Sequence, residues 1–242
     1  MINNICLSSF LYNRICIEGD SMSDVENKNI YNLIKKLYIV VFEDGRKLLT
    51  TDIAKLETGK YFYEVEYYKD GILEINEDID EIDDALFYEA FNINGCSSKD
   101  LKKIIINSNR SITIGAYAFS RCDNLESLDI NCKNDRFDLV SFKEQCFEEC
   151  SGLKDVNISP SDKTMFDKEC FSKCDSLEEV NQNANTIIAA DFAFYGCKKL
   201  RHFDFPNSKF NAFEGVFNSC NSFKKAEFNN INCLSGGTHP QY

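Results

Sequence analysis

A short motif recurs in the second half of the chain, and it constrains the fold more than any other feature. Five segments align without gaps, at residues 115–130, 144–158, 168–182, 191–205 and 214–228. Each carries one phenylalanine at the same place: Phe119, Phe147, Phe171, Phe194 and Phe217. A unit of roughly 25 residues is too short to bury its own core, so copies must stack on one another. The repeat therefore predicts a solenoid.

The apolar positions of one unit predict how each coil is built. A cysteine follows each phenylalanine by three residues: Cys122, Cys150, Cys174, Cys197 and Cys220. We expect both columns to be buried, with the thiols acting as small apolar groups. The stretch from Leu125 to Ile130 alternates as a short parallel strand does, and Gln182 is the one break in this pattern. The Ala-Phe-x-x-Cys part predicts a tight turn or short helical segment on the opposite side.

The segment from Ile114 to Ile130 reads Ile-Gly-x-x-Ala-Phe-x-x-Cys-x-x-Leu-x-x-Leu-x-Ile. This pattern resembles the BspA-like class of leucine-rich repeats, over about residues 86–233, in five clear units and one degenerate unit. The degenerate unit has Leu101 and Ile104 in place, with Phe91 displaced by an insertion. Later units replace the motif glycine, Gly115, by other residues.

The resemblance implies an α/β solenoid, a leucine-rich-repeat coil with a short-stranded parallel sheet on one face and little regular helix. It also implies adhesion or protein recognition, at a cell surface or inside the cell, and supplies no catalytic residues.

The sequence divides into four parts. Residues 1–24 are expected to be a flexible lead, in which Met22 is a second candidate start, and residues 234–242 a tail. Residues 25–85 predict a small α+β capping unit before the solenoid of residues 86–233. An apolar face from Ile30 to Leu37 predicts a helix, and Asp44-Gly45 and Asp70-Gly71 predict two hairpins, the second joining Tyr61–Tyr68 to Ile72–Ile75. An independent binding domain is the alternative interpretation of this unit.

Charge and composition exclude several classes of function. The net charge of −12 argues against nucleic acid as the main partner. No apolar run approaches the roughly 20 residues that span a bilayer, so no membrane insertion is expected. The first residues make no convincing secretory signal, and the 12 cysteines therefore indicate free thiols in a reducing, cytoplasmic setting. A surface or secreted location remains the alternative.

No pattern of catalytic residues is present, and we predict that the protein is not an enzyme and has no cofactor. The two histidines, His202 and His239, belong to no catalytic motif, and there is no phosphate-binding loop or dinucleotide fingerprint. No metal site is expected either. Cys146, Cys150, Cys170 and Cys174 lack a nearby histidine, and repeat positions already explain them.

An acidic run from Glu74 to Asp84 gives the second candidate cation site. It fails the EF-hand pattern because Ile82 occupies a ligand position and Asp83 takes the place of the required glycine. We interpret this run as a solvated, charged linker.

One set of residues predicts a binding surface by position alone. The side chains that point outward from the stacked strands form two polar columns on the sheet face. The first is Asp129, Asn157, Asn181, Asp204 and Glu227, and the second is Glu126, Lys154, Glu178, Arg201 and Lys224. We expect a protein partner to bind this face. The alternatives are a solvated face without a ligand, a structural subunit or spacer of a larger assembly, and a surface adhesin; the oligomeric state stays open.

Overall fold

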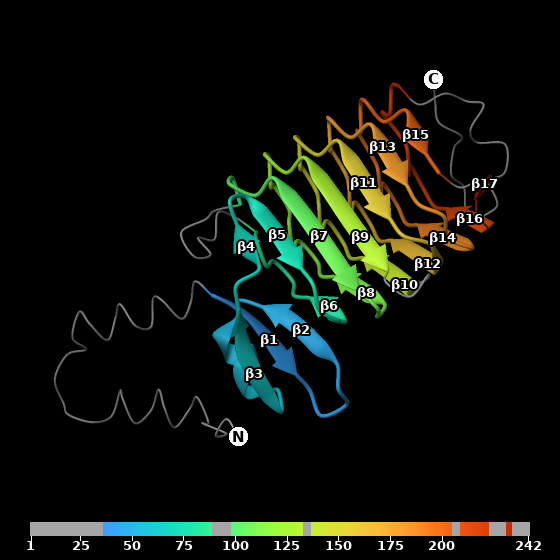
Figure 1. Ribbon diagram of the computed structural model, residues 1–242. Helices are drawn as coiled ribbons and strands as arrows, with labels where there is room; N and C mark the ends of the chain where they lie inside the picture. Colours follow the sequence, from blue (N-terminus) through green and yellow to red (C-terminus); the bar gives the residue numbers. More distant parts are fainter. Residues whose placement is uncertain (1–35, 89–97, 133–136, 205–208, 223–230, 234–242) are drawn as a thin grey trace, which may run out of the picture.

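A computed structural model describes residues 36–88, 98–132, 137–204, 209–222 and 231–233, which form a solenoid of stacked parallel strands (Figure 1). The predicted solenoid and its small content of helix are thus confirmed. The predicted lead (1–24), the tail (234–242) and the helix predicted from Val25 lie outside the described residues, apart from Leu37, which begins a strand.

Each coil contributes one strand to each of two sheets. The seven-stranded sheet has the order β15-β13-β11-β9-β7-β5-β4 and the ten-stranded sheet the order β17-β16-β14-β12-β10-β8-β6-β2-β1-β3. The strands of the first are β4 (Tyr68–Lys69), β5 (Ile72–Ile75), β7 (Lys103–Ser108), β9 (Ser127–Cys132), β11 (Asp155–Ile158), β13 (Glu179–Asn181) and β15 (His202–Phe203). Those of the second are β1 (Leu37–Val41), β2 (Lys47–Thr50), β3 (Tyr61–Val65), β6 (Glu81–Ile82), β8 (Ile112–Ile114), β10 (Phe137–Phe142), β12 (Ser161–Phe166), β14 (Thr186–Ala189), β16 (Lys209–Ala212) and β17 (Ile231–Cys233).

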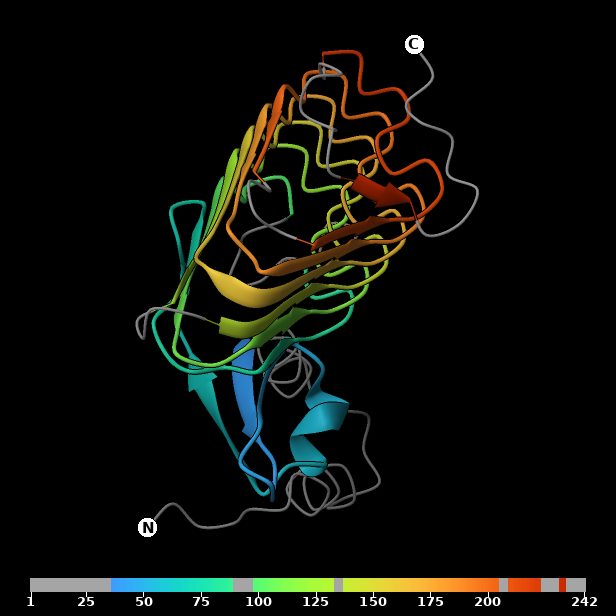
Figure 2. The ribbon, with the colours of Figure 1, turned by 90° about the vertical axis from the view of Figure 1, so that its right-hand side faces the viewer.

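The sequence predicted one parallel sheet, whereas the coils build two. The view along the stack shows the two sheets as separate sides and the turns as a third (Figure 2). The ten-stranded sheet arises because the residues before each motif also alternate. Val140 and Phe142 are buried and pair in register with Ile112 and Ile114 of the preceding coil. In the described residues the Ala-Phe-x-x-Cys part is a turn without regular helix.

The residues before the solenoid extend the ten-stranded sheet. The first predicted hairpin is β1–β2, which pairs antiparallel with Val41 opposite Lys47. The second prediction was wrong in extent, because β3 pairs with β1, and only β4 forms a hairpin with β5 at the Asp70-Gly71 turn. A 3-10 helix, η1 (Ile53–Glu57), separates β2 from β3.

Coil stacking begins at β5, within the segment that the sequence assigned to the capping unit. β5 pairs parallel to β7, and β6 joins β2 to β8 in the ten-stranded sheet. The core of the first coil is continuous with that of the others and includes Leu37, Ile39 and Leu49 from β1 and β2. The N-terminal strands therefore cover the apolar end of the first coil, as a solenoid requires.

A ladder of stacked phenylalanine rings runs through the core. The rings of Phe119, Phe147, Phe171 and Phe194 are buried, with successive centroids 5.0–5.3 Å apart and nearly parallel planes. Phe87 extends the ladder by one coil at 5.5 Å from Phe119. The sequence analysis assigned the phenylalanine of the first coil to Phe91, which lies outside the described residues. In the structure Phe87, four residues earlier, takes this place in the ladder.

The cysteine column is buried as predicted, and its thiols also bond between coils. The Sγ atoms of Cys150, Cys174, Cys197 and Cys220 donate to the carbonyl oxygen of the motif phenylalanine one coil back, at 3.1–3.2 Å. Each of these carbonyl oxygens also accepts the amide of the cysteine in its own coil, so the thiol adds a second hydrogen bond to the same acceptor.

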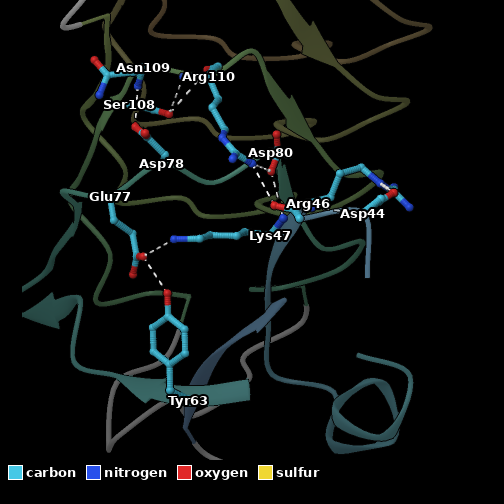
Figure 3. A network of polar contacts seen from close by, with 11 residues as sticks. Asp44, Arg46, Lys47, Tyr63, Glu77, Asp78, Asp80, Ser108, Asn109 and Arg110 are labelled. Atoms are coloured by element: carbon cyan, nitrogen blue, oxygen red, sulfur yellow. Dashed lines mark hydrogen bonds and ion pairs between the residues drawn. The ribbon is translucent and has the colours of Figure 1, made fainter. Parts of the chain in front are cut away.

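The acidic run is a structural junction, and its interpretation as a solvated linker was wrong (Figure 3). Glu77 accepts hydrogen bonds from Lys47 Nζ at 3.0 Å and Tyr63 Oη at 2.6 Å. Asp80 accepts from the Lys47 amide and from Arg110 Nη1, both at 2.8 Å. These carboxylates join the N-terminal strands to the first two coils, and the two partners of Asp80 lie 33 and 30 residues away in sequence.

Candidate binding face

The candidate site is the outward face of the seven-stranded sheet. Side chains alternate along a strand, so the buried Leu128 and Ile130 of β9 leave Ser127 and Asp129 facing outward. The parallel register places equivalent residues of successive coils side by side, with Asp129 opposite Asn157 and Asn157 opposite Asn181. The face therefore consists of columns that run along the stack, perpendicular to the strands.

The first predicted column forms a hydrogen-bonded ladder over three coils. Asn181 Nδ2 donates to Asn157 Oδ1 at 2.9 Å, and Asn157 Nδ2 donates to Asp129 Oδ1 at 2.8 Å. The other oxygen of Asp129, Oδ2, lies 2.8 Å from Lys103 Nζ. Hydrogen bonds between neighbouring coils thus fix the positions of these polar side chains.

A second amide ladder, which the sequence analysis missed, lies two residues further along the strands. Asn131 Nδ2 donates to Asn107 Oδ1 at 2.9 Å, and Asn107 Nδ2 donates to Asn76 Oδ1 at 2.6 Å. Asn76 Nδ2 in turn donates to Glu74 Oε1 at 3.1 Å. The recurrence of a small polar residue after the Leu-x-x-Leu-x-Ile stretch, with Asn131 in one unit and Ser159 in the next, is the sequence signal for it.

The second predicted column lies one residue before the strands and is divided into ion pairs. Lys154 Nζ lies 3.1 Å from Glu126 Oε2, and Arg201 Nη2 lies 3.1 Å from Glu178 Oε2 and 2.8 Å from Glu179 Oε1. These pairs are exposed, so each contributes little to stability. Of the ten predicted site residues, Lys224 and Glu227 lie outside the described residues.

The middle of the face carries an excess of negative charge. Asp155 lies directly opposite Glu179 in the register of β11 and β13. Burial, together with the charges of Glu179 and Glu178, raises the pKa of Asp155 above its ordinary value. Like charges on adjacent strands repel, so this part of the face favours a positively charged neighbour.

A shallow depression of about 330 Å³ lies at the carboxyl ends of these strands. Its lining residues all have polar side chains except Ile158, and they include both ladder ends: Asn131, Asn157, Ile158, Ser159, Asn181, Gln182, Asn183 and Asp204. Gln182 explains the one break in the repeat, because its buried side chain accepts from the Ala184 amide at 3.1 Å and donates to the Asp204 carbonyl oxygen. It thereby supports the floor of the depression.

The described residues contain no group of three or more His, Cys, Asp or Glu side chains placed to hold a metal ion. Burial raises the pKa values of the thiols in the cysteine column, which keeps these groups protonated. Among the same residues, no helix is long and apolar enough to cross a membrane.

Stacked coils with a flat, polar sheet face define a leucine-rich-repeat scaffold of the kind that typically binds other proteins. The family model described as the BspA type leucine rich repeat region matches the chain in six copies, over residues 59–166 and 141–238. The chain belongs to this family. No curated protein and no solved structure matches it.

Proposed function

We propose that the protein is a non-enzymatic module that binds another protein on the outward face of its seven-stranded sheet. The family and the fold support a role in protein interaction or adhesion. The single observation that carries the choice of face is the pair of amide ladders. Their side chains are held in position before any partner arrives, so binding costs little side-chain entropy.

The opposite choice, the ten-stranded sheet, offers a less organised surface. Its outward positions mix apolar and polar groups, with Met165 opposite the buried Ser141 and Ile188 opposite Asn211 in the register. No chain of side-chain hydrogen bonds across three strands of this sheet occurs in the described residues. Specific recognition of a polar partner therefore favours the seven-stranded sheet.

Site-specific photo-crosslinking in the native source tests this proposal. A photoreactive amino acid at Ser127, on the outward side of β9, should yield a crosslinked partner protein. The same residue at Thr186, on the outward side of β14, is the matched control and should yield none. Crosslinks from Thr186 alone, or from neither position, would count against the seven-stranded face.

We further propose a reducing, cytoplasmic location. The eight cysteines with described side chains are free, and seven of them are buried. The donor role of the column requires S–H groups, which a disulfide lacks. Alkylation of protein taken directly from its source should modify nearly all 12 cysteines after unfolding without reductant. Modification of only a few would favour an oxidising, extracellular location and an adhesin.

A further inference from the structure

The two amide ladders have a fixed direction. A carboxylate only accepts hydrogen bonds, so Asp129 requires the Nδ2 group of Asn157 to face it, and Glu74 requires the same of Asn76. Each amide then turns its carbonyl oxygen toward the next coil, where the following Nδ2 group finds it. The orientation of every amide therefore follows from the carboxylate at its N-terminal end.

Both ladders end at the same place with an open acceptor. The last amides are Asn131 and Asn181, and both line the depression. No donor among the described residues reaches Asn131 Oδ1 or Asn181 Oδ1. A hydrogen-bonded chain polarises its members, so these terminal oxygens are stronger acceptors than those of isolated amides.

Asp204 adds a negative charge to the same depression. Its Oδ1 atom lies 2.7 Å from His202 Nε2, and its Oδ2 atom has no partner within the described part of the chain. The nearby Ser159 and Gln182 side chains already accept hydrogen bonds from the amides of Cys132 and Ala184. The depression thus offers three unused acceptors, Asn131 Oδ1, Asn181 Oδ1 and Asp204 Oδ2, and the last of them is charged.

We propose that this depression binds an arginine or lysine side chain presented by the partner protein. The inference rests on the proposed function and names the chemistry of the partner at one point of the interface. A guanidinium carries five N–H donors and an ammonium three, which matches several acceptors around one carboxylate. The volume lies at the lower end of the range of about 300–1,000 Å³ for ligand pockets, enough for one or two side chains.

Three blocked tripeptides test the chemistry in solution with the full-length protein. Gly-Arg-Gly and Gly-Lys-Gly are the probes, and Gly-citrulline-Gly is the uncharged isostere of the first. Titration is followed through the side-chain amide NMR signals of Asn131 and Asn181. The charged peptides should shift these signals saturably. Their affinity should fall about tenfold when the salt concentration rises from roughly 50 to 300 mM, because exposed charges become screened. Equal shifts with the citrulline peptide, or no saturable shift with any peptide, would overturn the proposal.

Two variants locate the site. Asp204→Asn and Asn181→Leu should each weaken the arginine peptide about tenfold or more. Asp138→Asn, an exposed residue of β10 in the ten-stranded sheet, makes the same charge change and should leave binding unaltered. If Asp138→Asn weakened binding of the arginine peptide equally, the effect would come from net charge, which would contradict a defined site. Unchanged peptide binding in both site variants would do the same.

The same variants separate this inference from the proposed function. Crosslinking at Ser127 that persists at full yield in both Asp204→Asn and Asn181→Leu would overturn the cation site and leave the binding face standing. Site-dependent peptide binding without any crosslink at Ser127 would reject the protein-binding face itself, and with it the identity of the cation as a partner's side chain.

Discussion

At the scale of single residues, the turns of the solenoid depend on left-handed backbone at positions that glycine mostly does not occupy. Two residues per turn have positive φ, one two residues before the motif phenylalanine and one two residues after it. They are Tyr117, Arg121, Gln145, Glu149, Glu169, Lys173, Phe192, Gly196, Gly215 and Ser219. Each non-glycine residue there costs roughly 1–2 kcal/mol. Backbone hydrogen bonds offset this cost, such as the bond from the Arg121 amide to the Glu148 carbonyl oxygen at 2.8 Å.

Exchanging glycine and non-glycine residues at one turn position tests this account. Ser219→Gly should raise the free energy of unfolding by about 0.5–1 kcal/mol, because φ is 64° there and the side chain is exposed. Gly196→Ala should lower it by about 1 kcal/mol. The nearest atom to an added Cβ at Gly196 is Lys173 Cα at 3.7 Å, so its cost is one of backbone conformation alone.

Urea unfolding at neutral pH measures both variants. Effects of the same sign at the two positions would contradict a backbone origin, since both substitutions alter the same turn position in different coils.

Several residue roles could be predicted from the sequence, and others could not. The buried Phe171 and Cys174 follow from the repeat alone, because only inward positions recur as apolar residues. The bond from Cys174 Sγ to the Phe147 carbonyl oxygen does not follow, since it depends on the offset between two coils. The predicted column of Asp129, Asn157 and Asn181 does exist, but its direction became evident only from the hydrogen bonds.

At the scale of elements, the junction between the N-terminal strands and the first coil is held by Glu77. Burial alone would raise the pKa of this carboxyl group, but hydrogen bonds from Tyr63, Tyr67 and Lys47 outweigh that effect and lower it. Glu81, four residues on, behaves in the opposite way. Burial and the charges of nearby aspartates raise its pKa. Two glutamates of one acidic run therefore have opposite effects on stability.

Isosteric substitution should separate the two glutamates. The Glu77 pKa is depressed in the folded state, so its contribution is present above about pH 4.5 and is lost as pH falls through the folded value. Glu77→Gln should cost roughly 1–2 kcal/mol at pH 7 and reduce the loss of stability on acidification. Glu81 has a raised folded pKa, so its ionised form opposes folding at pH 7, and Glu81→Gln should stabilise the protein there.

Thermal unfolding between pH 3 and pH 7 gives the comparison. A destabilising Glu81→Gln at pH 7, or a Glu77→Gln variant with the wild-type pH dependence, would contradict these assignments.

The second sheet illustrates why elements were harder to predict than the repeat. The buried residues of its strands, such as Ile112 and Ile114 of β8, alternate with outward residues as clearly as those of the motif strands do. Strands this short, however, carry little signal on their own. The interpretation of the acidic run as a solvated linker was wrong for a different reason. A dense series of carboxylates is typical of a solvated segment, and the partners of the half-buried Asp80 are Lys47 of β2 and Arg110, two residues after β7.

At the scale of the whole molecule, each coil contacts mainly the coils before and after it. The described strands pair only with immediate neighbours in their sheets, and the phenylalanine ladder likewise joins adjacent coils. Stability in such an array is close to a sum of coil and interface contributions, so a terminal coil opens more readily than a central one.

Residue-resolved thiol labelling should reveal this gradient. Under native conditions Cys220, in the last fully described turn, should react with iodoacetamide faster than Cys174 and Cys150 in central coils. Cys150 and Cys174 are fully buried, so opening of the coil limits their rates, whereas Cys220 is 9% exposed. Mass spectrometry of peptides after timed pulses gives the three rates. Identical rates would indicate that the solenoid opens only as a single unit.

Because the amide ladders have a fixed direction, the number of coils sets the position of the terminal acceptor along the stack. Each asparagine is oriented by the coil before it and presents its carbonyl oxygen to the coil after it. The orientation of the last amide therefore does not depend on the number of coils in the ladder. Inserting or deleting one whole repeat between Asp129 and Asn181 would move the receiving end by one strand spacing, about 4.8 Å, and leave its chemistry the same. The distance between the first carboxylate and the terminal acceptor of a ladder can therefore be changed in multiples of one strand spacing without altering either end.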